Sequence, residues 1–277
     1  MTTWLITGAG GGLGRALMTA ALARGDKVAG TVRDRKLVAE LEALAPGRAH
    51  VLIADMADEA SVHAAVEAAE EKLGGLDILI NNAGYGLVGA VEEASLAEVR
   101  AQFEVNVYGP IAAIQAALPH FRRRKAGHII NITSVSGLAA WAGTGIYSGS
   151  KHALEGVGRT LAQEVGPLGI KVTNIEPGGI RTDFAGRSLR VTERKIDDYT
   201  DTAHNAERSL GSHTGQEGGD PAKMAAAILR IAGQPDAPLQ LLLGADAVHY
   251  ATQSWASFQE EFGRWAPLSL STGFDEG

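Results

Sequence analysis

The 277-residue sequence contains no cysteine, which excludes disulfide bonds, thiolate catalysis and cysteine-ligated metal sites. The eight histidines lack metal-ligand spacing, so we expect no metal. No apolar run reaches the ~20 residues that span a bilayer, and no signal-like leader precedes the first apolar segment. Basic residues form one dense run, at 122–125, within a formal net charge of −7. We therefore expect a cytoplasmic protein with neither a membrane nor a nucleic acid as partner.

Short apolar segments alternate with segments of helical periodicity along the chain. The pattern predicts strands at 4–7, 27–32, 51–54, 78–80, 128–132, 171–175 and 239–243. It predicts helices at 13–24, 36–44, 61–73, 95–118, 146–165, 221–232 and 246–262. Ser95 and Glu98 have the spacing of a capping box at the start of the fourth of these helices. Such alternation favours βαβ units, and hence an α/β, doubly wound parallel sheet of Rossmann type in a single three-layer domain spanning 1–277.

One long polar stretch, 184–220, interrupts this alternation. Stretches of this length inside compact domains are usually functional or disordered. Its glycines and mixed charge favour a lid over a bound substrate, and a dispensable surface insertion is the alternative.

A glycine-rich motif, T-G-A-G-G-G-L-G at residues 7–14, lies between the first predicted strand and the first predicted helix. Gly8 permits a tight turn, Gly12 permits close approach of a pyrophosphate, and Gly14 permits close packing of the helix. The helix that begins at Leu13 would present unpaired N–H groups and a positive dipole end to an anion. The motif therefore predicts a dinucleotide site.

The spacing T-G-x-x-x-G-x-G resembles that of the short-chain dehydrogenase/reductase family. Asn81-Asn82-Ala83-Gly84 is similar to the family's N-N-A-G beside the cofactor, and Asp55 occupies the place of its adenine-side acid. P-G-G-I-R-T at 177–182 resembles the P-G-x-x-x-T that holds the carboxamide, which implies contacts from Ile180 and Thr182.

A second group of residues resembles the family's Asn-Ser-Tyr-Lys tetrad: Asn106, Ser134, Tyr147 and Lys151. Tyr147 and Lys151 are four residues apart and should share a helix face. Ketone reduction needs a positioned acid, and a nearby ammonium would lower the pKa of Tyr147 toward neutrality. The resemblance implies that Ser134 bonds the substrate oxygen, that Lys151 also grips the nicotinamide ribose, and that Asn106 holds a water.

The end of the second predicted strand indicates which dinucleotide is used. NAD-preferring relatives usually carry an acid where this sequence has Val32, and the following Arg33 resembles the cation that clamps a 2′-phosphate. The cofactor implied is NADP(H), for hydride transfer to or from a hydrophobic ketone or secondary alcohol. Alternatives are an NAD-linked alcohol dehydrogenase, an epimerase or dehydratase, and a dinucleotide-binding regulatory protein, which would not need the tetrad. A homo-oligomer, dimer or tetramer, is possible.

Overall fold

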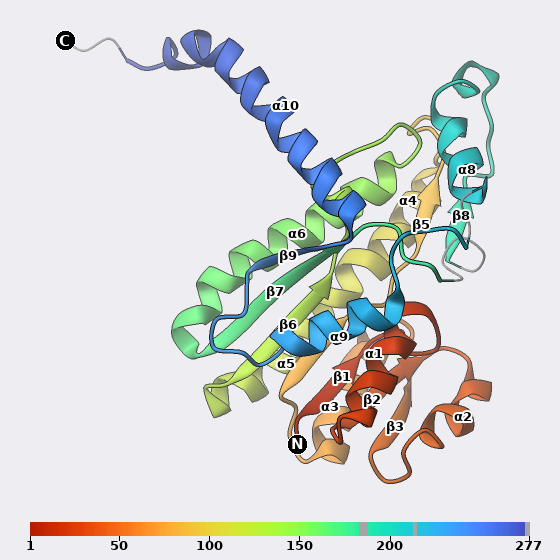
Figure 1. Ribbon diagram of the computed structural model, residues 1–277, viewed down its shortest axis with the longest axis vertical. Coiled ribbons are helices and arrows are strands. Elements are labelled where there is room, and N and C mark those ends of the chain that lie inside the picture. Colours follow the sequence, from red (N-terminus) through yellow and green to blue (C-terminus); the bar gives the residue numbers. More distant parts are fainter. Residues whose placement is uncertain (183–187, 213–214, 275–277) are drawn as a thin grey trace.

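The computed structural model describes residues 1–182, 188–212 and 215–274. Within these residues, seven strands form one parallel sheet in the order β3-β2-β1-β4-β6-β7-β9 (Figure 1). The strand order reverses between β1 and β4, as in a doubly wound sheet, which confirms the predicted fold class. The strands are β1 (Thr3–Ile6), β2 (Lys27–Val32), β3 (Ala49–Ile53), β4 (Ile78–Asn81), β6 (Gly127–Ile132), β7 (Ile170–Pro177) and β9 (Gln240–Leu243).

Helices cover both faces of this sheet. The strands alternate their side chains, so Leu5 packs on one face while Trp4 and Ile6 pack on the other. Burial on both faces explains why these strands read as nearly continuous apolar runs. One face is covered by α1 (Gly12–Ala23), α2 (Val38–Glu42) and α9 (Pro221–Ile231), and the other by α3 (Glu59–Leu73), α5 (Gly109–Arg124) and α6 (Gly145–Val165).

The helix predicted over 95–118 is divided into three parts. It begins as α4 (Leu96–Phe103) with the expected capping box, in which Ser95 and Glu98 satisfy each other's backbone N–H groups. A π-helical turn at Glu104–Tyr108 follows, and α5 then continues the chain. Such turns occur frequently at functional sites, and this one contains Asn106.

The stretch 184–220 contains more regular structure than its sequence indicates. It includes β8 (Leu189–Val191), a 3-10 turn at Asp197–Tyr199 and α8 (Ala203–Ser212), whereas 183–187 and 213–214 lie outside the described residues. β8 pairs with β5 (Gly86–Val88), which the sequence also did not predict, because both strands are only three residues long.

The final helix, α10 (Ala245–Leu270), is longer than predicted and projects away from the body (Figure 1). None of the helices in the described part of the chain is long and apolar enough to cross a membrane. The helix predicted over 36–44 is shorter than expected, because a 3-10 turn at Arg35–Leu37 precedes α2.

Candidate active site

The four predicted catalytic residues come from elements that meet at the carboxyl edge of the sheet. Ser134 follows β6 and caps a short 3-10 turn, accepting a hydrogen bond from the Ser136 amide at 3.0 Å. Tyr147 and Lys151 occupy the first two turns of α6. Ligands of open α/β sheets bind at this edge, near the point where the strand order reverses.

The structure brings the Ser134 and Tyr147 side chains into hydrogen-bonding contact. Ser134 is buried, and its hydroxyl is held by the loop amide as well as by the tyrosine. Two hydroxyl groups therefore converge on one point, as a site for a carbonyl oxygen requires.

Lys151 lies behind this pair, and only 6% of its surface is exposed. Its Nζ donates to the Ile132 carbonyl at 2.9 Å and lies 5.8 Å from the centroid of the Tyr147 ring. Burial lowers the pKa of Lys151 from 10.5 to about 8.

The expectation that Lys151 lowers the pKa of Tyr147 is wrong for this structure. Desolvation raises the pKa of the Tyr147 hydroxyl, and the hydrogen bond with Ser134 opposes that rise only in part. The lysine ammonium is turned toward a backbone carbonyl rather than the phenol. Tyr147 therefore keeps its proton at neutral pH, which is the form that a proton donor needs.

The side chain of Asn106 is held by hydrogen bonds to the backbone of Tyr85 and to the side chain of Ser150. Its Oδ1 accepts from the Tyr85 amide at 3.1 Å, and its Nδ2 donates to the Tyr85 carbonyl at 2.9 Å and to Ser150 Oγ at 3.1 Å. A Cβ placed on Gly84 would lie 3.2 Å from Asn106 Oδ1 and 3.6 Å from Lys151 Nζ. Only a glycine at position 84 leaves the space between these two side chains open. A water held there by Asn106 remains a prediction.

The glycine loop has the geometry of a phosphate cradle. Gly8 and Gly12 have φ of 71° and 52°, which side chains disfavour, and a Cβ on Gly14 would lie 2.3 Å from the Gly8 carbonyl oxygen. The amino terminus of α1 has no side-chain cap and no acidic residue in its first turn. Its N–H groups are thus available to an anion, and the residues present fit a dinucleotide.

Asn82 supports this loop, a role that the sequence did not assign to it. Its Nδ2 donates to the Thr7 carbonyl at 2.8 Å, while its backbone N–H donates to Thr7 Oγ1 at 2.9 Å. These bonds tie the end of β4 to the end of β1. The only sequence signal was its place next to Asn81 in the N-N-A-G segment.

One predicted contact residue, Thr182, lies beside the loop. A Cβ on Gly12 would be 3.6 Å from the Thr182 side chain, so the 177–182 segment adjoins the cradle. Ile180 pairs through its backbone with Gly219. The Leu13 side chain is buried in the core, which leaves only its backbone to face a phosphate.

The residues predicted on the adenosine side lie at the ends of neighbouring strands. Arg33 is exposed directly after β2, and Asp55 is exposed two residues after the end of β3. Val32, which precedes Arg33, lies against the glycine loop, since its Cγ1 is 3.5 Å from the place of a Cβ on Gly10.

Asn81 is the last residue of β4, and its side chain is buried, with 1% of its surface exposed. Its Nδ2 donates to Asn131 Oδ1 at 3.0 Å, and Asn131 Nδ2 donates to Asn174 Oδ1 at 3.0 Å. These three asparagines are in register on β4, β6 and β7. The contact of Asn81 with the cofactor therefore stays a prediction. What the structure shows is that its side chain links β4 to β6 by a hydrogen bond. The signal for Asn131 and Asn174 was an amide inside an apolar strand.

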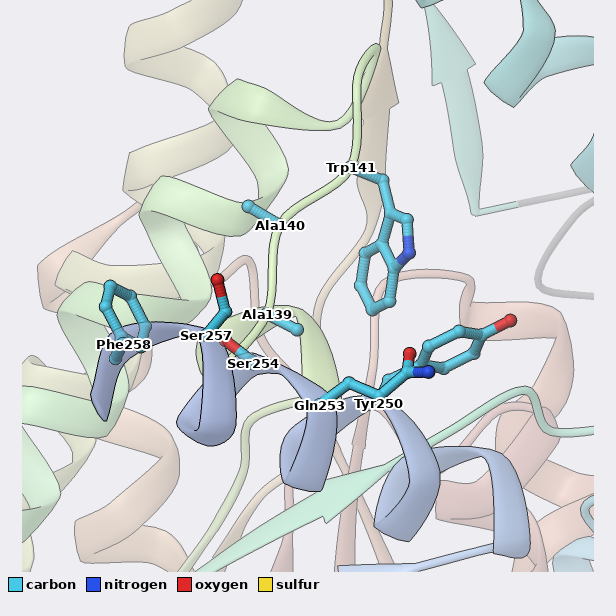
Figure 2. Close-up of a pocket in the computed structure, with 8 residues that line it drawn as sticks. All are labelled: Ala139, Ala140, Trp141, Tyr250, Gln253, Ser254, Ser257 and Phe258. Atoms are coloured by element: carbon cyan, nitrogen blue, oxygen red, sulfur yellow. The ribbon is translucent and has the colours of Figure 1, made fainter. Parts of the chain in front are cut away.

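A pocket of about 310 Å³ opens between the segment that follows Ser134 and the first turns of α10 (Figure 2). Trp141 and Tyr250 meet edge to face there, with ring centroids 5.2 Å apart. Figure 2 also shows Ser254, Ser257 and Phe258 of α10 facing Ala139 and Ala140 across it. Among the described residues, no group of three or more histidines and acids could hold a metal ion.

A family model described as short chain dehydrogenase matches residues 2–191. The chain belongs to this family. Over 270 residues it is 38% identical to "Oxidoreductase BOA17" of Botryotinia fuckeliana, covering 97% of this chain and 98% of the relative. It is 34% identical over 254 residues to "3-ketodihydrosphingosine reductase" of Bacteroides thetaiotaomicron, covering 91% of each. Both names place this short-chain dehydrogenase/reductase among the oxidoreductases.

Solved structures agree with this membership. A short-chain dehydrogenase from Streptomyces avermitilis has a TM-score of 0.92 and 37% identity over 98% of both chains. A short-chain dehydrogenase/reductase from Burkholderia phymatum, solved in complex with NAD, has a TM-score of 0.80 and 25% identity, covering 100% of this chain and 97% of that one. The family and these neighbours support a nicotinamide dinucleotide as the cofactor.

Proposed function

We propose that this short-chain dehydrogenase/reductase is an NADP(H)-dependent carbonyl reductase that converts a hydrophobic ketone to a secondary alcohol. The observation that carries the proposal is the hydrogen-bonding contact of the Ser134 and Tyr147 hydroxyls, with Lys151 Nζ 5.8 Å from the centroid of the Tyr147 ring. A dinucleotide-binding regulatory protein would not need this arrangement of buried groups.

The residues divide the chemistry between them. A bound nicotinamide dinucleotide would supply the hydride that the carbonyl carbon requires. Tyr147 donates its phenolic proton to the carbonyl oxygen, while Ser134 donates a hydrogen bond to that oxygen as its charge grows. The Lys151 side chain is mostly protonated at neutral pH, because its pKa is about 8. It is proposed to grip the nicotinamide ribose, next to the Tyr147 ring, whose centroid lies 5.8 Å from Nζ.

The proposed substrate is apolar and bulky. The pocket that adjoins 139–141 receives the aromatic rings of Trp141 and Tyr250, together with polar groups from α10. The relative from B. thetaiotaomicron is named "3-ketodihydrosphingosine reductase". Burying a methylene group is worth about 0.8 kcal/mol, so kcat/KM should rise up to roughly fourfold per carbon along a ketone series.

Replacing the acid tests the reaction class. Tyr147→Phe should abolish NADPH oxidation with a panel of ketones of increasing length, and should leave dinucleotide affinity near normal, because only the proton-donating hydroxyl is lost. Tyr108→Phe, which removes the hydroxyl of a half-exposed tyrosine, is the matched control and should keep full activity. More than a tenth of wild-type kcat in Tyr147→Phe would refute the assignment of the acid.

The preference for NADP(H) rests on Arg33 and on the absence of an acid at Val32. A charge-assisted bond to the 2′-phosphate contributes about 1.5–3 kcal/mol, or roughly 10- to 150-fold in discrimination. The double variant Val32→Asp/Arg33→Ala should therefore shift kcat/KM toward NADH. A wild-type enzyme that prefers NADH would contradict the proposal, as would a double variant with no shift.

The described part of 184–220 is proposed as the lid over this substrate. Its strand β8 pairs with β5, and α8 packs on the loop that follows Ser134, since a Cβ on Gly143 would lie 2.3 Å from the Ala203 carbonyl oxygen. The segment therefore contacts both β5 and the loop that contains Gly143.

A further inference from the structure

The outer half of α10 overhangs the body of the protein. The 26 residues of this helix extend about 39 Å at 1.5 Å per residue. Its first turns are seated on the body, where Ala247 and Ala251 are fully buried and Ser254 Oγ donates to the Leu138 carbonyl at 2.9 Å. Beyond Phe258, which borders the pocket of Figure 2, the helix projects outward (Figure 1).

One apolar stripe runs along this helix from the seated part to the overhanging part. The spacing between its members alternates between three and four residues. This spacing is typical of the apolar face along which one helix packs against another. The stripe consists of Val248, Ala251, Trp255, Phe258, Phe262 and Trp265. Ala251 is covered by the chain's own body, whereas the four aromatic side chains are 48–68% exposed. The same face that packs at the base therefore continues outward with a large exposed surface.

The charges of α10 argue against a membrane as the covering surface. Helices that lie in a membrane interface carry Lys and Arg on their polar face. The opposite face of α10 carries Asp246, Glu260 and a single Arg264, Glu261 lies at the rim of the stripe, and the whole chain has a net charge of −7. An anionic lipid surface would repel this helix.

The size and symmetry of the stripe fit a second copy of the same helix. Large aromatic side chains can bury about 150–250 Å² each, so four half-exposed ones present roughly 300–500 Å² on each chain. Two copies related by a two-fold axis would together bury roughly 600–1,000 Å², which reaches the lower end of what a specific interface buries. The positions flanking the seam suit close packing, since they include the uncharged Gln259 and Ala266.

We propose that the apolar stripe of α10 is a self-association surface, on which the outer half of one α10 packs against α10 of a second copy of this chain. The contact is isologous, so the same residues lie on both sides. It is separate from the catalytic residues, and its test does not depend on the reaction.

The experiment measures molar mass by sedimentation equilibrium over a range of protein concentrations. Phe262→Glu introduces a charge into the stripe at a residue that is 68% exposed, so the fold should survive, as circular dichroism would verify. We expect this variant to have half the wild-type molar mass at micromolar concentration. Ala256→Glu, which puts the same charge outside the stripe on the same helix, should keep the wild-type mass.

A second readout uses fluorescence and vesicles. Trp255 and Trp265 are half exposed, so their emission should shift to the blue as wild-type protein is concentrated, but not in Phe262→Glu. Equal molar masses for the wild type and both variants would overturn the proposal. So would flotation of the wild type with phosphatidylglycerol vesicles that Phe262→Glu abolishes, because a membrane would then be the partner.

Discussion

Replacing Glu93 by glutamine should loosen the segment 188–208 from the body without unfolding the protein. Glu93 is buried, with 1% of its surface exposed. Its Oε1 accepts from the Ile196 amide and from His204 Nε2, both at 2.7 Å, and its Oε2 accepts from the Ala90 amide at 2.8 Å. Two of these three bonds hold the proposed lid.

The magnitude follows from the charge of this carboxylate. Although burial by itself would raise the pKa of Glu93, the bonds with His204 and with the amides of Ala90 and Ile196 lower it from 4.5 to about 2. Its attachment of the lid is therefore fully present above pH 4.5 and is lost as the pH falls toward 2. Hydrogen bonds to a charged group contribute about 1.5–3 kcal/mol, against about 0.5–1.5 for neutral ones. Losing the charge on two lid bonds should cost about 2–3 kcal/mol locally, or roughly 30- to 150-fold in the open population.

Amide hydrogen exchange across 196–208 measures this opening directly. Protection there should fall by the same factor in Glu93→Gln, and KM for the ketone should rise more than kcat falls. Glu92→Gln is the matched control, because Glu92 also bonds the segment, through the Tyr199 hydroxyl at 2.7 Å, but is exposed. Exposed pairs contribute at most about 1 kcal/mol, or less than about sixfold. Unchanged protection in Glu93→Gln, or an equal loss in both variants, would refute the reasoning.

Two further changes address the interior and the glycine loop. Burial and the adjacent Glu155 raise the pKa of Glu176 to about 8, so the folded protein holds a proton that the unfolded chain releases, and stability should fall as pH rises from about 4.5 to 8. Glu176→Gln should remove this pH dependence. It should also raise the free energy of unfolding at pH 8 by on the order of a few kcal/mol, as measured by urea titration. A wild-type free energy of unfolding that does not change with pH over this range would contradict the prediction. Gly14→Ala should weaken NADPH binding at least about tenfold in fluorescence titrations, because the added Cβ would meet the Gly8 carbonyl oxygen. Gly156→Ala is the control and should leave the affinity unchanged, because the space around Gly156 is open. Equal affinities of the two variants would show that the glycine loop tolerates a side chain.

The sequence predicted those features whose signals are local. Lys27–Val32 is a strand over the range predicted, since it is short, contains the β-branched residues Val28, Thr31 and Val32, and is bounded by polar residues. The capping box at Ser95 and the glycines at the start of α1 were also recognised, because a cap and a tight turn depend on residues within a few positions of each other. The order and spacing of Asn106, Ser134, Tyr147 and Lys151 likewise grouped residues whose side chains lie close together in the fold.

Other features could not be predicted because they depend on residues that are distant in the sequence. β5 and β8 pair across about a hundred residues, and neither is long enough to show a periodicity. Glu93 reads as one acid among several between 92 and 98, and only its burial under the segment 188–208 makes it an anchor.

The pKa of Tyr147 shows most clearly where the tertiary structure decides. The sequence supplied a tyrosine and a lysine on one helix face, from which Coulomb attraction alone predicts a lowered pKa. In the folded chain the phenol is desolvated by its surroundings, and the lysine donates to the Ile132 carbonyl on a neighbouring strand. The sequence by itself determined which groups are present and in what order. Tertiary packing decided which of them lose water and which way each charge turns, because desolvation depends on every segment that folds over the site.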